Sequence, residues 1–197
     1  MNERTFIELA PRGCGGTAVL REAHKGIFCP QCRRPCNHNA PAEMIVDDCV
    51  LRPSPITAAA YDGVTFAKKS LLALIEIDDI SRYLHVGAVQ TFEGKLLEDW
   101  VYLYGVDRII VRGTREAGFR TCPGCGSTLY SSQGPEYLYP APDENVPIFQ
   151  TDLCGILIDS RYLDRSRLPK ARWLGSKIIK IADRPRDGLG EFPYPFG

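Results

Sequence analysis

Cys29-Pro30-Gln31-Cys32 and Cys122-Pro123-Gly124-Cys125 share the pattern C-P-x-C, and the rest of the chain is best read outward from them. We call them the first and the second knuckle. Two cysteines at this spacing can grip one metal ion from a tight turn, because proline fixes its own φ and removes an amide donor. The amides after the proline can then point at the sulfurs. Four sulfurs are the ligand set of a tetrahedral structural zinc site, so the sequence predicts one Zn²⁺ held by Cys29, Cys32, Cys122 and Cys125.

The residues that follow the two knuckles differ. Gly126 follows the second, and glycine tolerates the left-handed backbone that such a turn often needs. Arg33 follows the first, so we expect that knuckle to be strained or differently shaped. The stretch 33–121 between them is far longer than in a compact zinc finger. Metal binding would therefore clip distant parts of the chain together, and it contributes on the order of 10 kcal/mol to folding in small peptides.

The other four of the eight cysteines leave alternatives open. Cys36 or His38, close behind the first knuckle, could replace a sulfur or form a second site with Cys14. Cys49 and Cys154 lie in apolar runs, and we interpret them as small buried hydrophobic residues. A thiol redox pair is a further interpretation, but such a pair precedes a helix in thioredoxin-like proteins, and neither knuckle is followed by an amphipathic helix pattern.

The composition of the chain argues against several classes of protein. The chain has 197 residues, 24 basic against 24 acidic side chains and therefore no net charge, which argues against a general nucleic-acid binder. Its balanced charge and nineteen aromatic residues argue against disorder. The first residues lack the apolar core of a secretory signal and no apolar run could span a bilayer, so we expect a cytoplasmic protein without a membrane partner. Cysteines in a reducing compartment are more often metal ligands or catalytic groups than disulfides.

Charge is unevenly distributed along the chain. Residues 160–186 carry nine basic side chains and two acidic ones, whereas residues 133–159 carry no Lys or Arg. We call these the basic and the acidic segment. The two can attract each other as ordinary solvated surface, or one can be an interaction face for a charged partner. The acidic residues within the segment 133–159 are Glu136, Asp143, Glu144, Asp152 and Asp159.

Hydrophobic patterning predicts an α+β fold with an antiparallel sheet and few helices. No domain boundary is visible, so residues 1–197 are predicted to form one interlocked domain around the zinc-ribbon-like site. Residues 65–77 have apolar residues at helical spacing, and 78–81 and 159–165 are each expected to form a short turn. Residues 134–147 contain four prolines and are expected to form an irregular loop. Strands are predicted at 5–9, 44–51, 84–92, 100–104, 108–112, 153–158 and 173–182, with 84–112 as an antiparallel meander leading to the second knuckle.

No catalytic motif accompanies the cysteines. The three histidines, His24, His38 and His85, stand in no zinc-protease pattern, and the sequence has neither a nucleophile elbow nor a phosphate-binding loop. The pairs Asp47-Asp48 and Asp78-Asp79 are adjacent in sequence, so on a strand their side chains point to opposite faces. The sequence therefore predicts a non-enzymatic protein.

The two distant C-P-x-C knuckles, the second continuing with Gly126, resemble those of the bacterial double-CXXCG family, a myxobacterial paralogous family. The runs 146–152 and 156–160 are also similar to its C-terminal segment. Arg33 stands where that family has a glycine. The resemblance implies a metal role for the four knuckle cysteines, and some members resemble immunity proteins that neutralise a cognate toxin.

The resulting hypothesis is a zinc-stabilised protein that binds another protein, a toxin, as its immunity partner. Its candidate binding residues are Glu136, Asp143, Glu144 and Asp152, which suit a basic toxin. One alternative is a zinc-ribbon nucleic-acid adaptor that uses the basic segment, and a thiol redox enzyme is a further one.

Overall fold

The computed structural model describes residues 4–11, 24, 26–32, 34, 43–47, 55–59, 64–151, 155–170 and 174–190. Several of the predictions lie outside these residues. They concern the shape at Arg33, the alternative metal ligands Cys14, Cys36 and His38, the buried thiols Cys49 and Cys154, and the candidate binding residue Asp152.

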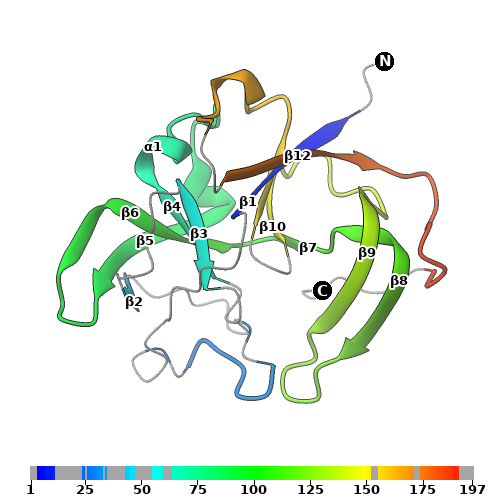
Figure 1. Ribbon diagram of the computed structural model, residues 1–197, viewed down its shortest axis with the longest axis horizontal. Helices are drawn as coiled ribbons and strands as arrows, with labels where there is room; N and C mark the ends of the chain where they lie inside the picture. Colours follow the sequence, from blue (N-terminus) through cyan, green and yellow to red (C-terminus); the bar gives the residue numbers. More distant parts are fainter. Residues whose placement is uncertain are drawn as a thin grey trace.

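The larger of two sheets has seven strands in the order β7-β10-β11-β1-β12-β9-β8 (Figure 1). The β8–β9 hairpin projects from one side of this sheet and ends at the second knuckle. The strands are β1 (Thr5–Pro11), β7 (Arg108–Ile109), β8 (Arg112–Thr121), β9 (Thr128–Leu138), β10 (Ile148–Thr151), β11 (Ile156–Asp159) and β12 (Leu174–Ile181).

The smaller sheet has five strands in the order β2-β5-β6-β4-β3. In Figure 1 it occupies the left half, and β7 carries the chain across to the larger sheet. The strands are β2 (Glu43–Val46), β3 (Ile56–Ala59), β4 (Val64–Lys68), β5 (Leu84–Thr91) and β6 (Leu96–Gly105).

One hydrophobic core joins the two sheets. Leu9 of β1 and Ile156 of β11 belong to the same buried cluster as Ile56 of β3 and Leu103 of β6, and all four are fully buried. Burial of such side chains stabilises the fold by about 1.5–3 kcal/mol each. The two sheets are therefore held together by apolar contact, apart from any metal.

The fold is mostly β, with a single α-helix among the described residues. The prediction of an antiparallel sheet holds only in part, because both sheets are mixed. β7 runs parallel to β10, β12 parallel to β9, and β2 parallel to β5. Parallel neighbours need long connections, and each of these connections runs through two other strands of the same sheet. They are β8 and β9 between β7 and β10, β10 and β11 between β9 and β12, and β3 and β4 between β2 and β5.

The predicted helix over 65–77 is confirmed only for Lys69–Leu72, and it is wrong for the residues before and after that turn. Residues 65–68 belong to β4, and α1 is a single turn, Lys69–Leu72. β4 pairs with β3 on one side and with β6 on the other, and Val64 and Phe66 are fully buried in the smaller sheet. Packing between two strands overrides the helical spacing of the apolar residues.

Two further predictions needed correction. The meander ends after β6, because β7 joins β10 and β8 joins β9 in the other sheet. The proline-rich stretch 134–147 is not all loop, since β9 extends through Pro135 to Leu138. The strands predicted at 5–9 and 84–92 are confirmed with shifts of a few residues, and those predicted at 153–158 and 173–182 are confirmed for their described residues, as β11 and β12. A turn at Ile80–Arg82 overlaps the one expected at 78–81, whereas the turn expected at 159–165 lies later in the chain, at Arg165–Arg167. Of the strand predicted at 44–51, β2 accounts for residues 44–46.

Across the part of the chain that the structure describes, no helix has the length and apolar content that crossing a membrane requires.

Candidate metal centre

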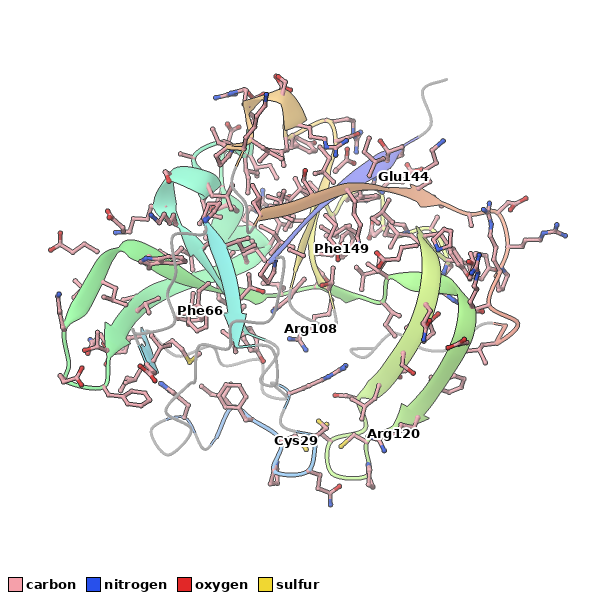
Figure 2. All side chains as sticks on the ribbon, viewed as in Figure 1. Cys29, Phe66, Arg108, Arg120, Glu144 and Phe149 are labelled. Atoms are coloured by element: carbon pink, nitrogen blue, oxygen red, sulfur yellow. The ribbon has the colours of Figure 1, made fainter. Side chains whose placement is uncertain are left out.

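The two knuckles meet at one end of the molecule (Figure 2). The second knuckle is the turn between β8 and β9 of the larger sheet. The first follows Ile27 and Phe28, which are buried in the core of the smaller sheet with Phe66 and Tyr102. A metal ion held by both knuckles would therefore tie one sheet to the other.

The two turns are closed by the same backbone hydrogen bond. Cys29 N–H donates to the Arg34 carbonyl and Cys122 N–H donates to the Ser127 carbonyl, each over 2.9 Å. In the second knuckle the Gly126 amide also donates to the Cys122 carbonyl over 2.8 Å, with Gly126 at φ +74°. The left-handed backbone expected at Gly126 is thus confirmed.

The four cysteine sulfurs converge from the two knuckles. All lie within 4.8 Å of one another, and this is the group of metal-binding side chains found among the described residues. Cys29 Sγ is 3.8 Å from Cys122 Sγ, and Cys32 Sγ is 3.7 Å from Cys125 Sγ. These distances are far longer than a disulfide bond, so the four thiols are free and can hold a metal ion.

In each knuckle, hydrogen bonds from backbone amides favour the thiolate form of the first cysteine. Hydrogen bonds from the amides of Cys32 and Gln31 lower the pKa of Cys29, against the effect of burial. Burial would raise the pKa of Cys122, but the amides of Gly124 and Cys125 outweigh it and lower the pKa to about 6. The amides after each proline thus point at a sulfur, as the C-P-x-C pattern predicted.

The second cysteines differ from the first. Burial raises the pKa of Cys32 to about 12, although the Arg34 amide donates to its sulfur. Cys125 Sγ lies 3.2 Å from the Ser127 hydroxyl. A bound divalent cation would favour the thiolate at all four positions, because metals coordinate cysteine in its deprotonated form.

Close packing between the knuckles explains why their third residues differ. A Cβ atom on Gly124 would lie 3.1 Å from Cys29 Sγ and 3.0 Å from the side chain of Gln31. Gln31 holds the matching position in the first knuckle and fills the space that Gly124 leaves. The first knuckle can carry the Gln31 side chain at its third position only because the second knuckle has glycine at its own third position.

The described histidines lie apart from the cysteines. His24 is buried, and its Nε2 accepts a hydrogen bond from the Ile45 amide over 3.1 Å. Burial lowers its pKa, which favours the neutral ring that this bond requires. His85 is exposed on β5, with its ring beside Tyr104. His24 thus has a structural role.

The acidic segment is partly paired within the molecule. Asp159 is fully buried between Arg4 and Arg161, each at 2.7 Å. Burial would raise the pKa of Asp159, but hydrogen bonds from Arg161 and Arg4 lower it. Glu136 pairs with Lys177, which also contacts Glu8 at 2.9 Å.

Asp143 and Glu144, by contrast, are exposed on the loop between β9 and β10. Arg4 holds this loop, because it donates to the carbonyls of Asp143 and Val146 over 3.0 and 2.9 Å. Asp107 lies close by: burial and the negative charge of Asp143 raise its pKa. Sequence reasoning missed Arg4 and Asp107, since no pattern links residues so far apart in the chain.

The basic segment is also used internally. Arg161 pairs with Asp159, Arg167 pairs with Glu76, and Lys177 pairs with Glu8 and Glu136. Arg165 donates to the Ser176 carbonyl over 3.1 Å. The attraction between the acidic and basic segments is therefore real, at Asp159–Arg161 and Glu136–Lys177.

Comparison with family models, with curated proteins and with solved structures gave no match to this chain.

Proposed function

We propose that this chain is a non-enzymatic protein that is stabilised by one structural Zn²⁺ on Cys29, Cys32, Cys122 and Cys125 and acts by binding a protein toxin as its immunity partner. The observation that carries the zinc part is the meeting of the four sulfurs. Four ligands at a Zn–S distance of about 2.3 Å in a tetrahedron stand about 3.8 Å apart. The separations of 3.8 Å for Cys29–Cys122 and 3.7 Å for Cys32–Cys125 fit this geometry.

The donor set supports a structural rather than a catalytic metal. Structural zinc sites are closed by four protein ligands, whereas catalytic sites keep one position for water or substrate. Four sulfurs fill the tetrahedron and leave no such position. The amides that donate to Cys29 and Cys122 stabilise thiolates, which suits a permanent clamp.

Purified protein is expected to contain one equivalent of zinc by elemental analysis. Cys125→Ser is expected to lose it, because serine replaces a soft sulfur ligand by a weak oxygen ligand. Cys154→Ser is the matched control, and it is expected to keep one equivalent. Two equivalents of zinc in the natural protein would indicate a second site, with Cys14, Cys36 and His38 as candidate ligands. A protein that contains no stoichiometric metal would instead favour a thiol redox enzyme.

The protein-binding part is supported by the loop that carries Asp143 and Glu144. Both side chains are exposed, and Arg4 fixes the backbone beneath them, so the loop presents its charges with little ordering left to occur on binding. Figure 2 shows Glu144 at the far end of the molecule from Cys29. The zinc would thus maintain the fold while a separate surface meets the toxin.

Glu136 contributes less than Asp143 and Glu144 to the toxin-binding surface, since it is paired with Lys177 and only a third of its side chain is exposed. Asp107 adds a carboxyl group next to Asp143. An acidic face of this kind suits a basic partner, such as a nuclease that binds the phosphate backbone.

Co-expression with a toxin encoded next to this chain's gene tests the immunity role. The natural protein is expected to restore growth and to co-purify with the toxin. Asp143→Lys with Glu144→Lys is expected to weaken the complex by calorimetry, because it reverses the charge of the loop. Glu93→Lys, an exposed change on the turn between β5 and β6, is the control. Unchanged affinity in the loop variant would reject this face, and a lack of protection by the natural protein would reject immunity.

A further inference from the structure

The four cysteines of the metal centre form two pairs, each of which joins one knuckle to the other. Cys29 and Cys122, whose sulfurs lie 3.8 Å apart, are both buried, and we call them the inner pair. Cys32 and Cys125, whose sulfurs lie 3.7 Å apart, are both half-buried, and we call them the outer pair. The two cysteines of one pair therefore share the same degree of access to solvent.

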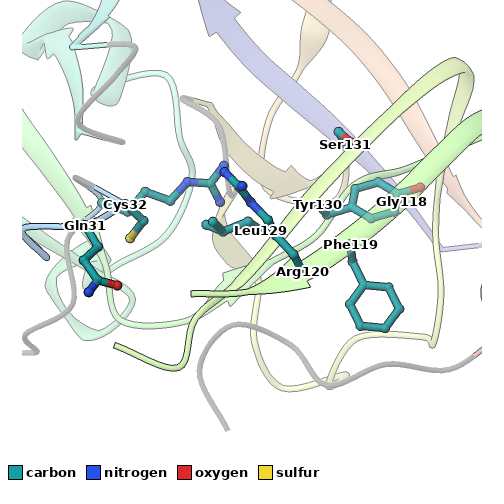
Figure 3. A pocket seen from close by; sticks show the side chains of 9 residues that line it. Gln31, Cys32, Gly118, Phe119, Arg120, Leu129, Tyr130 and Ser131 are labelled. Carbon is teal, nitrogen blue, oxygen red and sulfur yellow. The ribbon is translucent and has the colours of Figure 1, made fainter. Parts of the chain in front are cut away.

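The outer pair is the one that a small solute can reach. Cys32 lines an open pocket of about 580 Å³ beside the β8–β9 hairpin, together with Gln31 (Figure 3). Hydrogen peroxide is far smaller than this pocket, and peroxides oxidise accessible cysteines in preference to buried ones. Oxidation of the centre is therefore expected to begin at the outer pair.

The geometry of the outer pair also suits a disulfide. Each of its thiols lies at hydrogen-bonding distance from the other. The two sulfurs must approach by about 1.7 Å to reach the S–S bond length of about 2.05 Å. Rotation of the two side chains about their Cα–Cβ bonds moves the sulfurs over distances of this size.

We propose that the centre is a redox-sensitive clamp, in which hydrogen peroxide joins Cys32 to Cys125 and then Cys29 to Cys122 while the metal ion leaves. The inference rests on the metal site proposed above and goes beyond it, because it concerns the protein after the metal is lost. Disulfides across the knuckles would still tie one sheet to the other. Disulfides within the knuckles would not, since each would join two residues of the same turn.

Each disulfide forms in two steps. One cysteine sulfur attacks an oxygen of the peroxide and the O–O bond breaks, which gives a sulfenic acid and water. The partner sulfur then attacks the sulfenic sulfur, the S–O bond breaks, and the hydroxyl group leaves as a second water. The two sulfurs together lose two electrons and the peroxide gains them. Thiolates released by the metal take the two protons that these steps require from solvent.

The two possible kinds of linkage differ in their effect on stability. A bond from Cys32 to Cys125 joins residues 93 positions apart, whereas a bond from Cys29 to Cys32 closes a single turn. A crosslink that closes a longer loop removes more conformational entropy from the unfolded chain. Disulfides across the knuckles are therefore expected to raise the melting temperature of the metal-free protein by about 5 °C or more.

Peptide mapping of the zinc-loaded full chain after treatment with hydrogen peroxide tests the proposal. The chain carries Cys154→Ser, because Cys154 lies in the same tryptic peptide as the second knuckle. After free thiols are alkylated, tryptic peptide 26–33 is expected to stay joined to peptide 121–161 until the disulfides are reduced. A chromogenic chelator is expected to register one equivalent of released zinc, and reduction with added zinc is expected to restore it.

Two double variants that both keep Cys32 compare its possible partners. Cys29→Ser with Cys122→Ser leaves the outer pair, whereas Cys122→Ser with Cys125→Ser leaves the first knuckle alone. In the metal-free state, the outer-pair variant is expected to form its disulfide several times faster and to gain in melting temperature. The first-knuckle variant is expected to show no such gain. Circular dichroism before oxidation confirms that each variant is folded, and the peptide map of the full centre does not depend on them.

Separate peptides that each contain an internal disulfide would overturn the proposal, and so would sulfinic or sulfonic acids in place of disulfides. Equal gains in melting temperature for the two double variants would also overturn it. Purified protein without zinc would instead overturn the metal part of the proposed function. The same peptide map, made from the reduced protein, would still decide between linkages across and within the knuckles.

Discussion

Arg112 and Asp187 form an ion pair that is almost completely buried, with 1% and 0% of their side chains exposed. Arg112 Nε donates to Asp187 Oδ2 over 2.6 Å, and the Tyr130 hydroxyl donates to the same oxygen over 3.0 Å. Burial would raise the pKa of Asp187, but hydrogen bonds from Arg112 and the Leu189 amide lower it. The pair fastens the segment after β12 to the base of the hairpin that carries the second knuckle.

Asp187→Asn is expected to lower the free energy of unfolding by about 3–5 kcal/mol, because it leaves the Arg112 charge buried without its counter-ion. Urea unfolding measures this as a lower midpoint at an unchanged slope. Glu76→Gln is the control: it breaks the Arg167–Glu76 pair, whose side chains are 47% and 60% exposed, and is expected to cost less than about 1 kcal/mol. Equal costs would contradict the role assigned to burial.

Protonation of His24 is expected to lower the free energy of unfolding at mildly acidic pH. The pKa of His24 is lowered in the folded state, whereas in the unfolded chain it is about 6.5. The unfolded state therefore binds the proton first, so the stabilisation is complete above that pH and is lost as the pH falls through the folded-state pKa. His24→Gln is expected to flatten this part of the pH dependence in urea unfolding.

The control for His24 is His85→Gln, which alters an exposed ring. It is expected to keep the pH dependence of the natural protein. Thiolate protonation and metal release also destabilise the fold in acid, but they act in all three proteins. The difference between the His24 variant and the natural protein is thus the quantity to compare, and no difference would contradict the prediction.

Gly124→Ala is expected to weaken metal binding about tenfold or more, by displacing a ligand from its required position. The new Cβ would stand 3.1 Å from Cys29 Sγ and 3.0 Å from the Gln31 side chain. Competition with a chromogenic chelator measures the affinity. Adding Gln31→Ala is expected to restore part of it, because the flexible neighbour no longer crowds the site. An unchanged affinity in the single variant would contradict the packing argument.

Gly87→Ala is expected to destabilise the smaller sheet by about 1–3 kcal/mol through overpacking. Gly87 faces Tyr102 across the β5–β6 ladder, and an added Cβ would fall 1.9 Å from the ring of Tyr102. Thermal or urea unfolding gives the cost. Gly118→Ala on β8 is the matched control, since nothing lies within 4 Å of its Cβ position and its φ is negative. A cost as small as that of the control would mean that the ring moves aside.

The candidate metal site is largely readable from the sequence. C-P-x-C spacing, the donor amides after proline and the glycine at 126 are local features, and local backbone geometry determines them. The structure bears out the convergence of the four sulfurs and the positive φ of Gly126. Short apolar runs likewise predicted strands such as β1, β11 and β12.

The arrangement of the sheets could not be read in the same way. Apolar spacing alone does not separate a helix from a strand buried on both sides, which is why residues 65–68 were predicted as helix and form β4. Nothing local shows that β7 leaves the meander for β10, since strand pairing depends on contacts between residues far apart in the chain. The same holds for the pairing of Arg4 with Asp159 and of Arg112 with Asp187.

The sequence by itself determined the four candidate ligands, the mostly extended character of the chain and the opposed acidic and basic segments. Short-range rules govern each of these, namely backbone dihedrals, side-chain alternation and residue charge. Only the tertiary structure decided that the first knuckle is anchored in one sheet and the second knuckle in the other. It also decided which charged side chains form ion pairs within the molecule. These depend on long-range packing, in which residues become neighbours only once the whole chain has folded.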